Sequence, residues 1–188
     1  GGRGGLGAMQ TTLPMESSLL LVIHEAEAAV RRYRVLHDLA AQVGVPAHIT
    51  VAYPFKPTGA MGESDMARLG KLIAATPAFN IELASTGWFN TDVLFLTPTD
   101  PDPIIRLTRR VESAFPDYPI YGGAYSEIHP HLTVAHGSAE DVLRDIEGEL
   151  LPSLPITHRA TSVQLWSGPA LSTKRDGWHL VETFPLAN

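Results

Sequence analysis

One five-residue sequence occurs twice in this chain. His-Ile-Thr-Val-Ala occupies residues 48–52, and His-Leu-Thr-Val-Ala occupies residues 131–135. The two copies differ only in the exchange of isoleucine for leucine. A repeat kept for packing alone would preserve its apolar positions and let the polar ones drift, yet both copies carry histidine and threonine. The repeat therefore predicts two related halves that share one polar task.

The order of residue types within each copy is typical of a β-strand with one polar face. Successive side chains of a strand point to opposite sides of a sheet. We therefore expect the histidine, threonine and alanine of each copy on one face, with the apolar residues between them packed in a core. Two such strands, placed side by side, would form a notch with two imidazoles, two hydroxyls and little bulk at the alanines.

A notch of this kind suits the cleavage of a phosphodiester by water. One imidazole can accept the proton of the water and the other can protonate the leaving oxygen, because imidazole titrates near neutrality. We expect His48 and His131 to be this catalytic pair. The hydroxyls of Thr50 and Thr133 can donate to the non-bridging oxygens and so hold the phosphate. This chemistry requires no metal ion and no other cofactor.

The sequence around the first copy also resembles a known family. Residues 46–55 read Pro-Ala-His-Ile-Thr-Val-Ala-Tyr-Pro-Phe. Two His-x-Thr motifs with apolar flanks, in a chain of this size, are similar to the 2H phosphoesterase superfamily, whose members are described as 2′-5′ RNA ligase-like proteins or cyclic phosphodiesterases. The likeness is to the branch in which the first motif continues into Tyr-Pro-Phe, and it covers the chain from Ser18 onward.

The resemblance implies a bilobal α+β fold with pseudo-twofold symmetry and a central cleft. It implies metal-free opening of 2′,3′-cyclic phosphates, or of related cyclic nucleotides, to a monoester. His48 and His131 match the catalytic histidines of the family, and Thr50 and Thr133 match its phosphate-binding hydroxyls. One departure stands out, because some members carry a basic residue soon after the second motif, where this chain has His136. A weaker grip on phosphate, or a different substrate, would follow.

Apolar periodicity and turn residues predict the elements around the motifs. The expected strands are 19–23, 47–55, 79–89, 93–96, 131–135, 160–166 and 178–184. The expected helices are 25–43, one from near residue 64 to before Pro77, 102–115 with Asp102 as N-cap, and 138–150 with a capping box of Ser138 and Asp141. This order predicts an α+β fold of two duplicated β-sheet lobes with helices packed outside.

Composition narrows the class of partner. The net charge is −6, from 14 Lys+Arg against 20 Asp+Glu, and the chain has no basic run. Proteins that hold long nucleic acids neutralise many phosphates with a basic face. We therefore expect a small nucleotide or RNA-end substrate, without a long nucleic-acid footprint. The apolar run 19–23 is too short to span a membrane. We expect a cytoplasmic monomer.

The glycine-rich start of the chain has no initiator methionine. We expect residues 1–14 to be a cloning remnant and flexible N-terminus, with Met9 or Met15 as the native start. We expect residues 15–188 to form a single bilobal domain, because this length suits one domain built from two similar lobes.

Several side chains near the motifs are candidates for contact with a nucleotide, since aromatic rings stack on bases. We expect Tyr53, Tyr121, Tyr125 and His129 to contact substrate. The residues expected to have structural or solvated roles instead are Phe55 and Trp88 in the core, and Lys56 in a loop.

A metal site at His129, His131 and His136 is disfavoured by the same strand geometry. In a regular strand, His136 would point away from the other two rings. No acidic residue stands at a matching ligand spacing, although Glu127 is close in sequence. We therefore expect no metal site here.

Two other functions remain open from the sequence. The same notch could bind a nucleotide or an RNA end without turning it over. It could also run the reaction in reverse as an RNA 2′-5′ ligase, although the acidic net charge counts against the longer RNA footprint that ligation needs.

Overall fold

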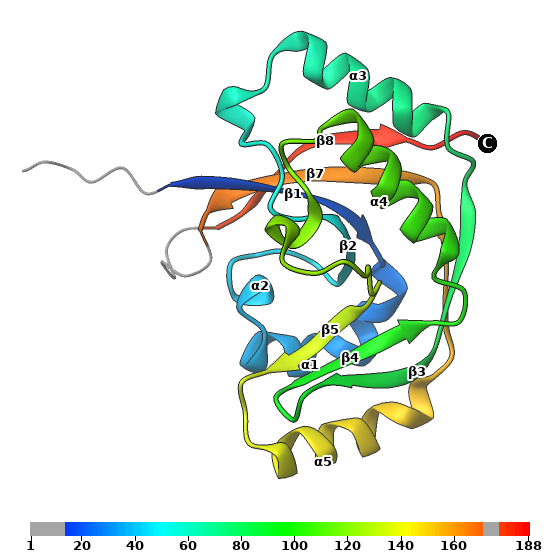
Figure 1. The fold of residues 1–188 in the computed structure, drawn as a ribbon. Coiled ribbons are helices and arrows are strands. Elements are labelled where there is room, and N and C mark those ends of the chain that lie inside the picture. The colour runs from blue at the N-terminus through cyan, green and yellow to red at the C-terminus, as the bar shows by residue number, and fades with distance from the viewer. Residues whose placement is uncertain (1–13, 171–176) are drawn as a thin grey trace, which may run out of the picture.

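Two four-stranded antiparallel sheets form the framework of the protein (Figure 1). The computed structural model describes residues 14–170 and 177–188, so the expectation of a flexible remnant over residues 1–14 lies, except for Pro14, outside the described residues. One sheet has the order β2-β1-β7-β8, formed by His48–Ala52, Met15–Val22, Ser162–Pro169 and His179–Pro185. The other has the order β5-β4-β3-β6, formed by Leu132–His136, Val93–Pro98, Phe79–Phe89 and Ile156–Ala160.

The two sheets are related by the repeat. Each motif strand, β2 or β5, lies at the edge of its sheet and pairs with the strand that precedes it in the chain, β1 or β4. The two motif strands contact each other where the sheets meet. The predicted α+β fold with duplicated sheet lobes is therefore confirmed, and the repeat brings both polar sequences to one seam.

Helices connect and cover the sheets. The α-helices are α1 Glu27–His37, α2 Leu39–Gln42, α3 Glu63–Ala74, α4 Asp102–Ala114 and α5 Glu140–Leu150. Short 3-10 turns lie at η1 His24–Ala26, η2 Thr58–Ala60, η3 Ile120–Gly123 and η4 Leu151–Ser153. Figure 1 shows α3 and α5, which follow the two motif strands, at opposite ends of the molecule. Among the helices of the described residues, none combines the length and apolar character needed to cross a bilayer.

The helix before each motif strand packs on the other lobe. Helix α1 leads into β2 but contacts β5, and helix α4 leads into β5 but contacts β2. One continuous hydrophobic cluster consequently includes residues of both sheets, such as Leu21 and Leu94. The two lobes therefore share one core, and each motif strand is supported from across the seam.

Both motif strands contain a β-bulge at the same position of the repeat, its valine. Leu19 and Leu20 of β1 pair with Ala52 and Thr50, so that Val51 is the extra residue. In the same way, Leu94 and Phe95 of β4 pair with Ala135 and Thr133 of β5, so that Val134 is the extra residue. A bulge interrupts the alternation of faces. As a result Ala52 is fully buried with the valine beside it, as is Ala135. The expectation that the alanines share a face with histidine and threonine was wrong for this reason.

Helix α4 is attached to the first bulge by a buried hydrogen bond. Its apolar stripe has the predicted spacing, with Ile104, Leu107 and Val111 fully buried. Thr108 is the polar member of this stripe and is also fully buried. Its hydroxyl donates to the carbonyl oxygen of Val51 at 2.8 Å. A buried carbonyl needs such a donor, since it has lost its contact with water.

The structure corrects the predicted boundaries. The helix expected over 25–43 is broken at Asp38, whose extended backbone (φ −132°) separates α1 from α2 and whose Oδ1 accepts from the Ala40 amide. The strand expected over 160–166 covers parts of two strands. Strand β6 ends at Ala160 and pairs with β3, whereas β7 begins at Ser162 and belongs to the other sheet. Polar residues such as His158 hide β6 from a search for apolar runs.

Helix starts also differ from the prediction. Helix α4 begins at Asp102 itself, with Pro101 as its N-cap residue. The capping box predicted at Ser138 is wrong, because α5 begins at Glu140 and Ala139 precedes it without a side-chain cap. The Ser138 hydroxyl instead lies 2.7 Å from His37 Nδ1. A tertiary contact has replaced the local one.

Replacing Thr108 with valine should destabilise the protein, because it keeps the shape of the side chain but leaves the Val51 carbonyl without its donor. We expect the free energy of unfolding to fall by about 1–3 kcal/mol in urea titrations. The matched control is Thr157→Val at an exposed position of β6, where the change should stay within about 0.5 kcal/mol. Equal stabilities of the two variants would show that the hydrogen bond adds nothing.

Candidate active site

The two motif histidines are held by the same local hydrogen bond. His48 begins β2, and its Nδ1 lies 2.7 Å from the carbonyl oxygen of Pro46. His131 immediately precedes β5, and its Nδ1 bonds to the carbonyl oxygen of His129. A carbonyl can only accept, so Nδ1 carries the proton in both rings. Each ring therefore presents Nε2 as its free nitrogen, which accepts a proton when neutral and donates one when charged.

Burial makes both imidazoles hard to charge. Burial, helped by the positive charges of Arg34 and His131, lowers the pKa of His48 to about 4, against the opposing effects of the Pro46 hydrogen bond and Asp38. Burial also lowers the pKa of His131, as does the nearby His129. His48 thus responds to the charge of His131 across the β2–β5 contact. The two rings lie within electrostatic reach of each other, as one site requires.

The motif threonines occupy corresponding places two residues after the histidines. Both are half-buried, and both precede the bulge. Thr50 borders the same small hollow as His48. Thr133 pairs with Phe95 of the neighbouring strand. Each hydroxyl therefore lies on the half-exposed side of its strand, next to its histidine.

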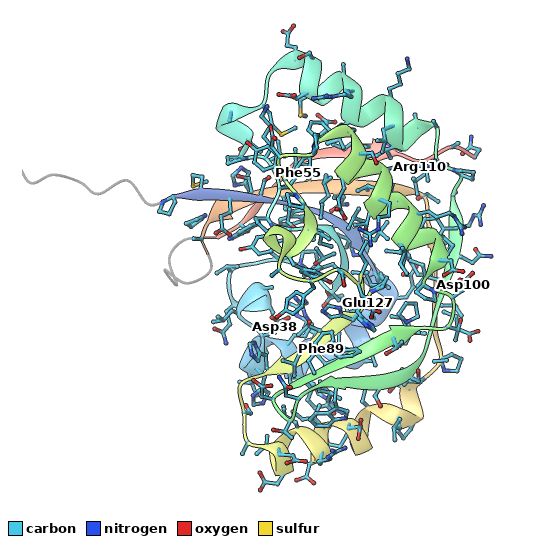
Figure 2. All side chains as sticks on the ribbon, in the orientation of Figure 1. Asp38, Phe55, Phe89, Asp100, Arg110 and Glu127 are labelled. Carbon is cyan, nitrogen blue, oxygen red and sulfur yellow. The ribbon has the colours of Figure 1, made fainter. Side chains whose placement is uncertain are left out.

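Two hollows adjoin the histidines. The smaller, of about 100 Å³, lies beside His48 and is bordered by Thr50, Tyr53 and Trp178, among others. The larger, of about 800 Å³, lies beside His131. Its other lining residues are Trp88, Phe89, Asn90, Tyr121, Tyr125, Ser126, Glu127 and His129. Figure 2 shows Phe89 and Glu127 over the central region of the molecule, from β3 and from the loop before β5.

The predicted substrate contacts fall into two groups. Tyr121, Tyr125 and His129 all border the larger hollow. The rings of Tyr121 and Tyr125 meet edge to face, with centroids 5.8 Å apart. The Tyr121 backbone amide donates to the Tyr53 carbonyl at 2.9 Å, which fastens this loop to the end of the first motif.

Tyr53 stands apart from the other three predicted contacts. It borders the smaller hollow, where its hydroxyl donates to Glu16 and its ring lies 6.4 Å from that of Trp178. Burial and the Glu16 carboxylate raise the pKa of Tyr53 well above its ordinary value. The phenol therefore stays protonated and is already engaged by Glu16.

The ring contacts that hold His131 were not predicted from the sequence, although Phe89 was noted there as an aromatic residue near the motifs. The ring meets Phe89 edge to face at a centroid distance of 4.9 Å and Phe95 at 5.1 Å. The Phe95 ring lies over Gly87 so closely that a Cβ there would be 2.4 Å from it. The signal was a glycine in a strand, which marks a close approach, but the strand pairing was needed to identify the ring.

Other assigned roles had mixed outcomes. Phe55 is core, as predicted. Trp88 packs against the core and donates to Glu147 at 2.7 Å. Lys56 is not a solvated loop residue: its side chain is 24% exposed and its Nζ lies 3.0 Å from an Asp65 oxygen. Asp65 lies in the first turn of α3, so Lys56 anchors that helix.

The histidines near the second motif have separate acidic partners. His136 Nε2 lies 3.7 Å from Asp92, and His129 Nε2 lies 3.6 Å from Glu127. Within residues 14–170 and 177–188, no three His, Cys, Asp or Glu side chains are grouped so as to hold a metal ion.

Comparison with known proteins places this geometry in a family. The sequence model of the 2′-5′ RNA ligase superfamily matches residues 23–169. No curated protein matches the sequence of the chain. Among solved structures, E. coli LigT complexed with 3′-AMP is similar at a TM-score of 0.59 and 18% identity, over 94% of this chain and 100% of that one.

Two further solved structures show the same fold. A structure described as a phosphoesterase has a TM-score of 0.57 and 17% identity, and covers 93% of this chain and 100% of its own. The protein TT0787 of Thermus thermophilus has a TM-score of 0.57 and 16% identity, and covers 92% of this chain and 97% of its own. At these identities the likeness is one of fold.

The low pKa of His48 makes stability depend on pH. Between pH 6.5 and about pH 4, His48 binds a proton in the unfolded chain but not in the folded protein. The free energy of unfolding should therefore fall by about 3 kcal/mol through this group as the pH drops from 6.5 to 4. Urea titrations at several pH values should show a smaller loss for His48→Gln than for the unaltered protein. The exposed His179→Gln variant should keep the full loss, and equal losses in all three proteins would contradict the assignment.

Proposed function

Because the chain belongs to the 2′-5′ RNA ligase superfamily, we propose that it is a metal-independent phosphodiesterase acting through two histidines. Its substrate would be a 2′,3′-cyclic phosphate, or a related cyclic nucleotide or RNA end. The observation that carries the proposal is the matched Nδ1 hydrogen bonding of His48 and His131, which leaves Nε2 of each ring without a hydrogen bond among the described residues, at the starts of two strands that contact each other.

The reaction would need only groups that the two strands supply. Nε2 of one neutral imidazole accepts a proton as the oxygen of a water molecule bonds to phosphorus. Nε2–H of the other, charged imidazole donates its proton to the ribose oxygen as the bond from that oxygen to phosphorus breaks. The product is a phosphate monoester, and the proton has passed from one ring to the other. Each positioned acid or base accelerates such a step by about 10²–10⁴-fold.

The substrate itself would prepare the pair for this exchange. Burial lowers the pKa of both rings, so both are neutral in the free protein near pH 7. A bound phosphodiester brings one negative charge, and an adjacent negative charge favours the charged form of imidazole. One ring would then take up a proton as the substrate binds, which produces the acid and the base together. The Thr50 and Thr133 hydroxyls would donate to the non-bridging oxygens and hold the phosphorus between the rings.

The larger hollow would receive the nucleoside. It adjoins His131 and is bordered by the aromatic rings of Phe89, Tyr121 and Tyr125, which can stack on a base. The solved structures of E. coli LigT hold 3′-AMP, phosphate and NADP+. A 3′-monoester such as 3′-AMP is what remains when the bond from O2′ to phosphorus is broken, so these ligands support a nucleotide in the corresponding cleft of this chain.

The alternatives share the same site. The family description includes RNA ligation, which would run the bond exchange in reverse on two RNA ends. The net charge of −6 gives little attraction for two RNA fragments. A module that only binds nucleotides would need the threonines and aromatic rings but not two histidines with free Nε2 atoms. Hydrolysis therefore uses more of the observed geometry than either alternative.

Substituting the catalytic residues should separate these functions. We expect His48→Ala and His131→Ala each to lower kcat/KM for a 2′,3′-cyclic nucleotide by about 10²–10⁴-fold, and Thr50→Ala and Thr133→Ala by less. A panel of 2′,3′- and 3′,5′-cyclic nucleotides with phosphorus NMR of the products would measure this, in the presence of a chelator. His179→Ala, at an exposed strand position, is the control.

The outcome decides among the candidate functions. Undiminished turnover in the double histidine variant would overturn the proposal. Tight binding of 3′-AMP in calorimetry, with no turnover of any cyclic nucleotide, would favour a binding module. Joining of cleaved tRNA halves in a gel assay would favour ligation.

The dependence of kcat/KM on pH should place the optimum on the acidic side of neutrality. Both histidine pKa values lie below the ordinary 6.5, and that of His48 is about 4. As the pH falls below 6.5, one ring of the free protein gains the proton that the acid needs. As it falls further through about 4, the second ring is protonated and the base is lost. A bell-shaped profile between these values is expected, and a rate that climbs continuously toward pH 9 would contradict it.

A further inference from the structure

A buried arginine lies behind the first histidine. Arg34 of α1 is 2% exposed. Its Nε lies 3.0 Å from Asp38 Oδ2, and its second terminal nitrogen donates to the carbonyl oxygen of Val45 at 3.1 Å. Its first terminal nitrogen lies 4.0 Å from Glu27 Oε1. Both acidic partners come from the same helix or its end, so the charge of Arg34 is balanced within this network.

The network holds the segment that leads into the motif strand. Arg34 binds the carbonyl of Val45, and Glu27 Oε1 accepts from the Ala47 amide at 2.6 Å. Pro46 lies between them, and its carbonyl is the one that fixes His48 Nδ1. Each of three consecutive residues before His48 is thus attached by a different hydrogen bond. The direction of the imidazole depends on these contacts.

Stability alone gives a weak reason for such a network. Burying charges costs free energy that pairing only partly returns, and apolar replacements of similar volume are often as stable. The other motif histidine is supported differently, because Phe89 and Phe95 hold its ring. Of the two, only His48 has its pKa lowered by the arginine charge. The ionic network is therefore specific to one member of the pair.

We propose that Arg34, with Asp38 and Glu27, is the positioning device of His48: by holding the Val45 carbonyl and the Ala47 amide, this network sets the direction of Nε2 for a general base. The proposal rests on the proposed function, because it takes His48 to act on a substrate. The charged groups that act on His48 are Arg34 and Asp38 from the α1 side and His131 from the position just before β5. Arg34 and Asp38 act in opposite directions, which provides the test.

The experiment titrates the His48 ring by NMR and measures kcat and KM in three variants of the network and in one control variant. The His48 resonance is identified by its loss in His48→Gln. Arg34→Met removes the positive charge and should raise the His48 pKa above about 4, although burial, the larger cause, still holds it below 6.5. Asp38→Asn removes the negative charge and should lower it. Arg34→Lys keeps the charge but cannot hold Asp38 and Val45 together, so the pKa should stay low while kcat falls by up to about 10²-fold. KM should change little.

The control is Arg31→Met, which removes the same charge from an exposed position of the same helix and should leave the pKa and kcat unchanged. Unchanged titration in Asp38→Asn, or a kcat of Arg34→Lys equal to that of Arg31→Met, would overturn the proposal. If Arg34→Met does not fold, these two variants decide alone. The proposed function and the positioning role can fail separately. Absence of turnover in the unaltered protein would contradict the proposed function. Opposite pKa shifts in Arg34→Met and Asp38→Asn without loss of kcat would contradict only the positioning role.

Discussion

The site depends on one hydrogen bond that occurs twice. In each motif the histidine Nδ1 is bonded to the carbonyl two residues earlier, so that the free nitrogen is Nε2 in both halves. Without that bond an imidazole could present either nitrogen and could turn about its Cα–Cβ bond. With it, the tautomer and the direction are set by the backbone itself. The duplicated strands and the exchanged helices bring the two motif strands into contact at one seam.

The parts of this site that the sequence predicts are those encoded locally. The repeat identified the two strands, the pair of histidines and threonines beside each other, and the two related lobes, because strand alternation and duplication are readable from residue types alone. The stripe on α4 had the expected helical spacing. Tyr121, Tyr125 and His129 were placed near the second motif because they precede it closely in the chain.

The parts that the sequence did not predict depend on contacts between distant residues. Arg34 lies within a helix and looks like a solvated residue until the segment before β2, with the Val45 carbonyl, is packed beside it. Phe95 reaches His131 only through the pairing of β4 with β5, and the alanines of the motif are buried by bulges that no residue type announces. Ser138 was predicted to cap a helix from its local sequence, but its hydroxyl contacts the distant His37 instead.

The exchange of helices between the lobes restricts how the cleft can move. Because α1 covers β5 and α4 covers β2, swinging one lobe away from the other would expose both motif strands and divide a shared core. Enzymes that close on their substrates by domain rotation have a hinge with few contacts across it. The seam of this protein is instead crossed by packed helices and a shared core, which disfavours rotation of one lobe against the other. Selection among ligands would then depend on the shape of the hollows beside the two histidines rather than on closure of the lobes.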